Sequence, residues 1–283
     1  MQVVFSERCL EYGRDHVENP RRVVRIVKSL KSSGFGFVDP DPAPEDLLEE
    51  VHAREYLEAL AEGREYDPDT PAYPGIYEIA RLAAGGAVTA ARISGFSVMR
   101  PPGHHAGIRG RALGAATKGF CYLNNIAVAV RSLGGRTLIL DIDGHHGNGT
   151  QEIFEGDPSV FYISLHRFPL YPGTGTCSGD NYLNFPLPAE CGEALYLRTL
   201  RKALSFVNVE RFDVIAVSVG FDAHEGDLAS LGLTSESYRR IGEIIGRLGK
   251  KTFFVLEGGY HELIGEDALN LITGFLRAME TRS

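Results

Sequence analysis

Apolar runs typical of β-strands alternate with segments of helical periodicity along most of this chain. The predicted strands are the run that ends at Leu140 and residues 96–99, 160–163, 214–219 and 253–256. Helical patterns occupy residues 74–93, 124–133, 190–207, 234–248 and 265–280, and another begins at Asn19-Pro20 and ends near Gly34. This alternation predicts an α/β fold with an open, mainly parallel sheet and helices on both faces.

Two loops interrupt this pattern in the first third of the chain. Residues 39–44 and 66–74 are rich in proline and aspartate, and each lies between short helical patterns, so we interpret them as loops rather than domain linkers. A chain of 283 residues with 43% hydrophobic content can bury a large core. We therefore predict a single domain over residues 1–283.

The charge balance restricts the classes of partner. The 29 lysine and arginine residues face 37 aspartate and glutamate residues, which gives a net charge of -8 and argues against direct nucleic-acid binding. No apolar run approaches the roughly 20 residues that span a bilayer, so we expect a cytoplasmic protein without a membrane partner. The cysteines form no close pair, which predicts reduced thiols rather than disulfides. They are Cys9, Cys121, Cys177 and Cys191.

Chemistry first becomes visible where the strand ending at Leu140 runs into Asp141-Ile-Asp143-Gly-His145. Side chains two residues apart lie on one face of an extended strand, so Asp141, Asp143 and His145 can point into one pocket. Carboxylate oxygens and imidazole nitrogens suit a borderline divalent ion such as zinc. Asp143 and His145 would supply two ligands, although a strand cap without a metal is the simpler local alternative.

Polar residues also follow the other predicted strands at the same end. They are Arg100 to His105, Ser164 to His166, Gly220 to Asp222, and Glu257 to Tyr260. Because ligands of open parallel sheets bind outside the carboxyl ends of the strands, we expect one shared site. Asp222 is the predicted third metal ligand, although its local sequence fits a turn cap equally well.

Three further side chains are candidates for proton transfer and charge stabilisation. His104 and His105 follow Pro-Pro-Gly, and such a pair can supply a general base and a second imidazole near one carbonyl. Tyr260 follows two glycines, and its phenol could stabilise an oxyanion. An ordinary half-buried tyrosine is the alternative.

Four motifs resemble those of the zinc-dependent histone deacetylase family, which includes acetylpolyamine amidohydrolases and acetoin-utilisation proteins. They are Arg100-Pro-Pro-Gly-His-His-Ala106, Gly119-Phe-Cys-Tyr-Leu-Asn-Asn125, Asp141-Ile-Asp-Gly-His-His-Gly-Asn-Gly-Thr-Gln151 and Leu256-Glu-Gly-Gly-Tyr260. They occur in the family's order, and the resemblance covers most of the chain. It implies an arginase/deacetylase-like fold.

The resemblance also implies a role for each candidate residue. Zinc, or ferrous iron, would be held by Asp143, His145 and Asp222. His105 would be the main general base and acid, with His104 as its electrostatic partner and Tyr260 as the carbonyl polariser. Asp141 matches the residue behind His104, and Asn148 the residue behind His105. Positions lining an acyl-lysine tunnel match Gly119, Phe120 and Tyr171.

Structural monovalent cations, potassium or sodium, are implied as well. The first would be held by Asp141, Asp143, His145, Ser164 and Leu165. The second would lie near Phe154, Asp157, Val160 and Asn181.

Three features depart from the family pattern. Asn148 stands where many members have aspartate, so the partner of His105 is neutral. Residues 107–118 form a longer link than usual between the histidine pair and Gly119. The substrate-orienting aspartate near the entrance matches either Asp67 or Asp69.

We therefore predict a metal-dependent amidohydrolase that removes acetyl or other acyl groups from acylated amines. The expected substrates are acetyl-lysine peptides or proteins, with acetylpolyamines as an alternative. A binuclear manganese ureohydrolase would need further carboxylates where this chain has Gly147 and Gly220. A catalytically silent acyl-lysine binding module would have lost ligands or the histidine pair, and all are present here.

Overall fold

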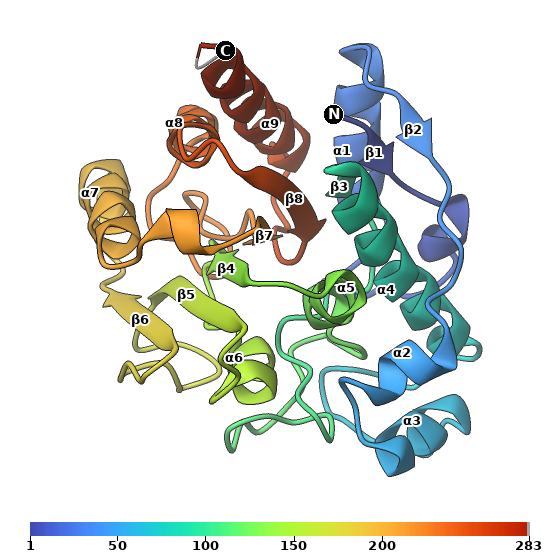
Figure 1. The fold of residues 1–283 in the computed structure, drawn as a ribbon. Coiled ribbons are helices and arrows are strands. Elements are labelled where there is room, and N and C mark those ends of the chain that lie inside the picture. Colours follow the sequence, from blue (N-terminus) through green and yellow to red (C-terminus); the bar gives the residue numbers. More distant parts are fainter. Residues whose placement is uncertain (282–283) are drawn as a thin grey trace.

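Eight parallel strands form one sheet in the computed structural model, which describes residues 1–281 (Figure 1). The five predicted strands are β3 (Phe96–Ser97), β4 (Thr137–Asp141), β5 (Val160–Arg167), β7 (Val214–Val219) and β8 (Lys251–Leu256). Three more are β1 (Val3–Val4), β2 (Phe37–Val38) and β6 (Tyr182–Leu187). The strand order is β2-β1-β3-β8-β7-β4-β5-β6, and every pairing is parallel. The predicted fold class is confirmed.

The longer helices occupy the predicted segments. They are α1 (Arg21–Ser32), α4 (Ile76–Ile93), α5 (Asn125–Leu133), α7 (Gly192–Ser205), α8 (Ser235–Gly246) and α9 (Ile264–Glu280). Shorter helices are α2 (Glu45–Glu49), α3 (Arg54–Ala61) and α6 (Asn148–Phe154), with 3-10 turns at Glu7–Leu10 and Val209–Arg211. Within residues 1–281, no helix combines the length and apolar character needed to cross a membrane.

Helices cover both faces of the sheet. Helices α7, α8 and α9 lie on one side and α4 and α5 on the other, while α1 packs against α9 (Figure 1). The central strands β4 and β7 are therefore buried along their whole length. This explains their nearly continuous apolar sequences, which are typical of parallel strands covered on both faces.

The strand order determines where the candidate site forms. Strands β3, β8, β7, β4 and β5 are consecutive neighbours in the sheet, and parallel pairing brings their carboxyl ends to one edge. The loops that leave this edge carry the polar segments identified in the sequence. Residues that are more than one hundred positions apart in the chain are therefore brought together.

Candidate active site and metal centre

A cavity of about 230 Å³ opens at the carboxyl edge of the sheet. Ten of the predicted site residues line it: Asp69, His104, His105, Gly119, Phe120, Asp143, His145, Tyr171, Asp222 and Tyr260. Pro102, Leu228 and Gly258 complete the lining. The structure thus brings the three proposed metal ligands, the histidine pair and the tyrosine around one space.

Asp143, His145 and Asp222 form a compact group of donor atoms. One donor atom from each residue lies within 4.8 Å of the other two. His145 Nδ1 is 2.8 Å from Asp222 Oδ2 and 3.3 Å from Asp143 Oδ1. Backbone N–H groups orient the carboxylates, because Gly258 donates to Asp143 Oδ2 and Gly144 to Asp222 Oδ1, each at 2.8 Å.

Asp141, Asp143 and His145 do not share one face of a strand, so that prediction is wrong. Strand β4 ends at Asp141, so Asp143 and His145 lie in the turn that follows and not on one face of the strand. The carboxylate of Asp141 lies apart from the group and contacts His104 instead. A tight turn after the strand, stabilised by the Asp143 N–H donating to Asp141 Oδ1 at 3.1 Å, brings Asp143 and His145 to the cavity.

The chemistry of this group fits a divalent cation. Burial and the charge of Asp143 raise the pKa of Asp222 to about 6. Burial also opposes ionisation of Asp143, but the charges of His104 and His145 hold the pKa of Asp143 below its usual value. A cation between the two buried carboxylates would offset their repulsion. The glycines keep this space open, since a Cβ on Gly220 would lie 1.9 Å from Asp143 Oδ2.

Each ring of the histidine pair has its own partner. His104 Nδ1 lies 3.0 Å from Asp141 Oδ2, and His105 Nδ1 lies 2.7 Å from Asn148 Oδ1. The Asn148 amide donates from Nδ2 to the carbonyl of Ala112 at 2.9 Å, which turns its Oδ1 towards His105. His105 therefore donates from Nδ1, and its Nε2 remains for proton exchange. The contact with Ala112 also links two departures from the family pattern, because Ala112 belongs to segment 107–118.

Electrostatics separate the two histidines. Burial alone would lower the pKa of His104, but the charges of Asp143 and Asp141 outweigh it and raise this pKa to about 10. Burial, together with the positive charges of His104 and His145, holds the pKa of His105 well below its usual value. This arrangement makes His105 the neutral ring, able to accept a proton, and His104 the charged one.

Two side chains that the sequence analysis did not identify position Tyr260. Asp227 Oδ2 accepts from the backbone N–H groups of Tyr260 and His261 at 2.7 and 3.0 Å. The guanidinium of Arg22 lies 4.5 Å from the centroid of the Tyr260 ring and donates from Nε to the carbonyl of Gly259. Burial raises the pKa of Tyr260 well above its usual value, so the hydroxyl remains a donor.

Glu257 is a third residue whose role the sequence analysis did not predict. Its Oε2 accepts from the backbone N–H groups of Gly103 and His104 at 2.7 and 3.1 Å, and Ser218 donates to its Oε1 at 3.2 Å. Burial raises the pKa of Glu257 to about 7. Glu257 therefore ties the end of β8 to the turn that carries the histidine pair. Its position between Leu256 and Gly258, at a strand end, was the available signal.

The predicted tunnel residues Gly119, Phe120 and Tyr171 all line the cavity. Gly119 and Phe120 both have positive φ angles, +53° and +69°. Thr70 Oγ1 accepts from the Phe120 N–H at 3.0 Å and holds this uncommon backbone conformation in place. Tyr171 donates its hydroxyl to the carbonyl of Thr117 at 2.9 Å, which leaves its ring against the cavity.

The two candidate entrance aspartates occupy different environments. Asp69 lines the cavity. Asp67 is buried and accepts from Arg111 Nε at 2.9 Å, so its carboxylate is already paired. Arg111 lies in segment 107–118, which also includes the buried Lys118, paired with Glu65 at 3.1 Å. Segment 107–118 therefore contacts residues 65–67 through two ion pairs, and of the two candidate aspartates Asp69 is the one that lines the cavity.

The residues expected to hold monovalent cations also lie close to one another. Asp141 and Ser164 are direct neighbours in the register of β4 and β5, with Leu165 next to them. At the second set, the Asn181 side-chain nitrogen donates to three backbone carbonyl oxygens at 2.7, 3.1 and 3.1 Å. Those carbonyls belong to Phe154, Asp157 and Val160. An amide N–H group therefore satisfies the oxygens expected to face the second cation.

Comparison with known proteins gives a consistent result across the chain. Residues 16–275 match the histone deacetylase domain. The sequence is 41% identical over 289 residues to a probable deacetylase of Methanothermobacter thermautotrophicus, covering 92% of this chain and 85% of that protein.

Solved structures show the same similarity. The HDA15 HD domain superposes with a TM-score of 0.84 at 34% identity, covering 98% of this chain and 89% of that chain. An acetylpolyamine aminohydrolase from Burkholderia pseudomallei superposes with a TM-score of 0.88 at 27% identity, covering 98% and 99% of the two chains.

Proposed function

Because this chain belongs to the histone deacetylase family, we propose that it hydrolyses acylated amines, releasing acetate or a longer carboxylate, in a metal-dependent reaction. One observation carries the proposal. The candidate ligands Asp143, His145 and Asp222 share a single cavity with the His104-His105 pair and Tyr260. A family member that only bound acyl-lysine would have no need to retain all of these groups.

The metal would be zinc, or ferrous iron, held by Asp143, His145 and Asp222. When bound, such an ion polarises a carbonyl and lowers the pKa of water towards neutrality. Three protein ligands are typical of catalytic zinc sites, which leave a position open. A binuclear manganese centre has less support, because a side chain at Gly220 would collide with Asp143.

The histidine pair would move the protons. His105 Nε2 accepts a proton from the attacking water and returns one to the departing amine. Asn148 keeps the Nδ1–H tautomer of His105 in place, at 2.7 Å. His104, charged through its contact with Asp141, adds a positive potential beside the reacting carbonyl.

Tyr260 would stabilise the negative charge that develops on the carbonyl oxygen. Its hydroxyl remains protonated because burial raises its pKa, so it can donate a hydrogen bond to that oxygen. Such a donor contributes most in a cavity from which water is excluded. Asp227 and Arg22 hold the tyrosine in position through the backbone and the ring face.

The substrate would enter between Phe120 and Tyr171, with Gly119 leaving space beside His105. Acetyl-lysine in a peptide or protein would pass between these two rings, and Asp69, which lines the same cavity, would orient the substrate backbone. Acetylpolyamine is the second candidate, favoured by the similarity to the Burkholderia pseudomallei enzyme.

We also propose one catalytic domain over residues 1–283 and a structural potassium or sodium ion beside Asp141 and Ser164. Asp143, His145 and Leu165 would also contribute ligands to this ion. A second ion near Val160 has less support, because the Asn181 amide would have to turn to present its oxygen.

A deacylation screen tests the proposal. Purified, zinc-loaded protein is incubated with acetyl-, propionyl-, butyryl- and longer acyl-lysine peptides and with acetylpolyamines, and amine release is measured. His105→Ala is the matched control, since it leaves all three metal ligands in place. The proposal is supported if the wild type releases amine and the His105→Ala variant does not. No release from any substrate in the metal-loaded protein would refute it.

A further inference from the structure

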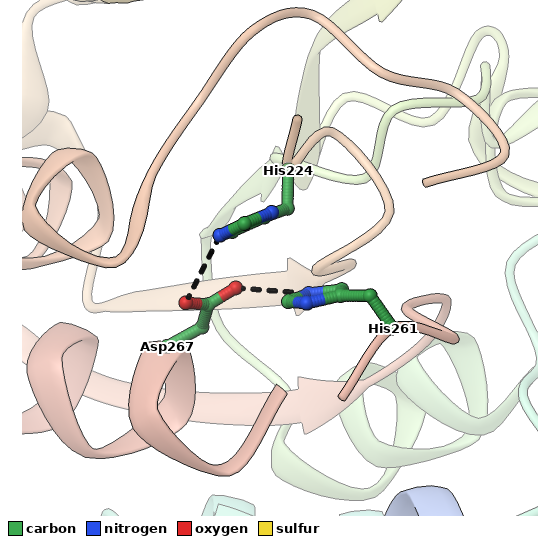
Figure 2. Close-up of side chains that lie close together, drawn as sticks. All are labelled: His224, His261 and Asp267. Carbon is green, nitrogen blue, oxygen red and sulfur yellow. Dashed lines mark ion pairs between the residues drawn. The ribbon is translucent and has the colours of Figure 1, made fainter. Parts of the chain in front are cut away.

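A second group of metal-ligating side chains lies outside the active-site cavity (Figure 2). His224 comes from the loop after β7, His261 from the loop after β8, and Asp267 from the first turn of α9. One donor atom from each lies within 4.8 Å of the others. The proposed deacylation uses none of the three.

Asp267 is the strongest observation in favour of a cation site in this group. Its side chain is fully buried, and Ser235 donates to its Oδ1 at 2.5 Å. Its Oδ2 makes no hydrogen bond, although it lies 3.0 Å from His261 Nε2, which also makes none. Among residues 1–281, the ion-pair contacts found for Asp267 are with the two histidines, so no lysine or arginine compensates its charge. Burying a carboxylate in this way is costly without a positive partner.

His224 already has the hydrogen bonding of a metal ligand. Its Nδ1 lies 3.0 Å from the carbonyl oxygen of Glu225, which can only accept, so the proton is on Nδ1. The lone pair of Nε2 is then directed towards Asp267, 3.9 Å from Oδ1. Metal-bound histidines typically donate their other ring N–H to a carbonyl or carboxylate in this way.

His261 would have to change its tautomer, one weak hydrogen bond and the orientation of its ring. Its Nδ1 accepts from the Leu263 N–H at 3.2 Å, whereas ligation through Nε2 requires the proton on Nδ1. The lost hydrogen bond is easily replaced, because Leu263 is 50% exposed and water can reach its backbone. The His261 ring stacks on His224, with centroids 4.0 Å apart and planes inclined by 18°. Because the Nε2 lone pairs of two nearly parallel rings do not meet at one point, binding of a single ion would turn one ring out of this stack.

We propose that His224, His261 and Asp267 bind one zinc-class divalent cation at a site separate from the catalytic centre. Two imidazole nitrogens and one carboxylate oxygen favour zinc, nickel or cobalt over magnesium or calcium. Bonds of about 2.0–2.1 Å place tetrahedral ligand atoms about 3.3 Å apart. Asp267 Oδ2 lies 3.0 Å from His261 Nε2, and Asp267 Oδ1 lies 3.9 Å from His224 Nε2, so His224 would move closer to the carboxylate when an ion binds. Water completes the coordination.

Binding at this site would connect three parts of the fold. The ion would tie the loop that carries Asp222 and the loop that carries Tyr260 to helix α9. Because a ligand that binds only the folded state stabilises it, the melting temperature should rise with the concentration of the ion.

Zinc titration of metal-stripped full-length protein tests the proposal without using activity. All variants carry Cys177→Ser, because Cys177 is the exposed thiol and could bind zinc adventitiously. We expect two zinc equivalents by calorimetry or dialysis. The Asp143→Ala/His145→Ala variant should bind one equivalent, at the site proposed here.

His261→Phe is the matched variant, because it keeps a ring stacked on His224 and removes the nitrogen donors. It should bind one equivalent, and none when combined with Asp143→Ala/His145→Ala. Circular dichroism identifies variants that fail to fold, and Asp267→Asn then replaces His261→Phe, since it keeps an acceptor for Ser235. The proposal would be overturned if His261→Phe or Asp267→Asn left the number of bound zinc ions the same as in the Cys177→Ser protein. It would also be overturned if the Asp143→Ala/His145→Ala variant bound no zinc.

Discussion

Tyr260 acts, in the proposed reaction, on charge that exists only as the carbonyl is attacked. Tyr260→Phe should therefore lower kcat about 100- to 1000-fold, equivalent to about 2.7–4 kcal/mol, and change KM little. Steady-state kinetics with an acetyl-lysine peptide measures this effect. Zinc content must match the wild type, since no metal ligand is altered. An unchanged kcat would remove Tyr260 from the mechanism.

The partner of His105 sets the pH range of the reaction. His105 is active as a base when neutral, so activity falls as the pH drops through its pKa, which burial and neighbouring positive charge lower. Asn148→Asp replaces a neutral partner with a negative one, raises this pKa and shifts the acidic limb of kcat/KM to higher pH. The variant also loses the hydrogen bond to Ala112, for a stability cost of about 1–3 kcal/mol. A stationary acidic limb in a folded variant would contradict the proposed role of the contact.

For single residues, the sequence predicted those whose side chains can bind a metal or transfer a proton. Asp143, His145 and Asp222 were predicted as a set, from several strands that end in polar residues, because each of them alone also fits a strand or turn cap. Asp227 could not be found in the same way, because it acts on backbone N–H groups of a loop 33 residues away. The choice between Asp67 and Asp69 depended on Arg111, whose contact is fixed only by the tertiary fold.

Between elements, Asp227 holds the loop after β8 against the loop after β7. Asp227→Ala removes the acceptor of two backbone N–H groups and should lower kcat by up to about 100-fold through displacement of Tyr260. In the Tyr260→Phe background the same change should have a much smaller effect, because the group it positions is already missing. A double-mutant cycle on kcat measures this coupling. Fully additive losses would show that Asp227 acts independently of Tyr260.

Element prediction was most accurate for long segments and missed three strands, whereas the two-residue strand β3 was found because its apolar run continues to residue 99. Helices α8 and α9 have sustained periodicity and were found within a few residues. Strands β1 and β2 contain two residues each, too few for any periodic signal. Strand β6 lies at the edge of the sheet, is partly exposed and includes Pro186, so its composition does not resemble that of a buried strand.

For the whole molecule, the net charge of -8 and Asp69 at the cavity favour cationic substrates. Steering by exposed charge weakens over a Debye length of about 10 Å at 0.1 M salt. kcat/KM for a lysine-rich acetyl peptide should therefore fall as salt rises, while a neutral acetyl-lysine peptide responds little. Potassium is held constant to separate any structural cation effect. Equal responses of the two peptides would exclude steering.

The order of strands is the part of the fold that periodicity could not supply. It places β8 between β3 and β7, so Glu257 reaches the His104 turn from 153 positions away. Such contacts depend on the path of the whole chain rather than on local pattern. The alternation of strand and helix patterns nevertheless predicted a parallel sheet whose strands end at one edge. This was sufficient to predict that the site residues lie close together.

The most direct test of the central claim is the dependence of deacylation on metal at Asp143, His145 and Asp222. Metal-stripped wild type and Asp222→Ala are titrated with zinc, and amine release is measured together with bound zinc. The wild type should gain activity in proportion to zinc at this site, while Asp222→Ala should remain nearly inactive at every zinc concentration. Full activity in stripped wild-type protein, or in zinc-treated Asp222→Ala, would contradict the proposed mechanism.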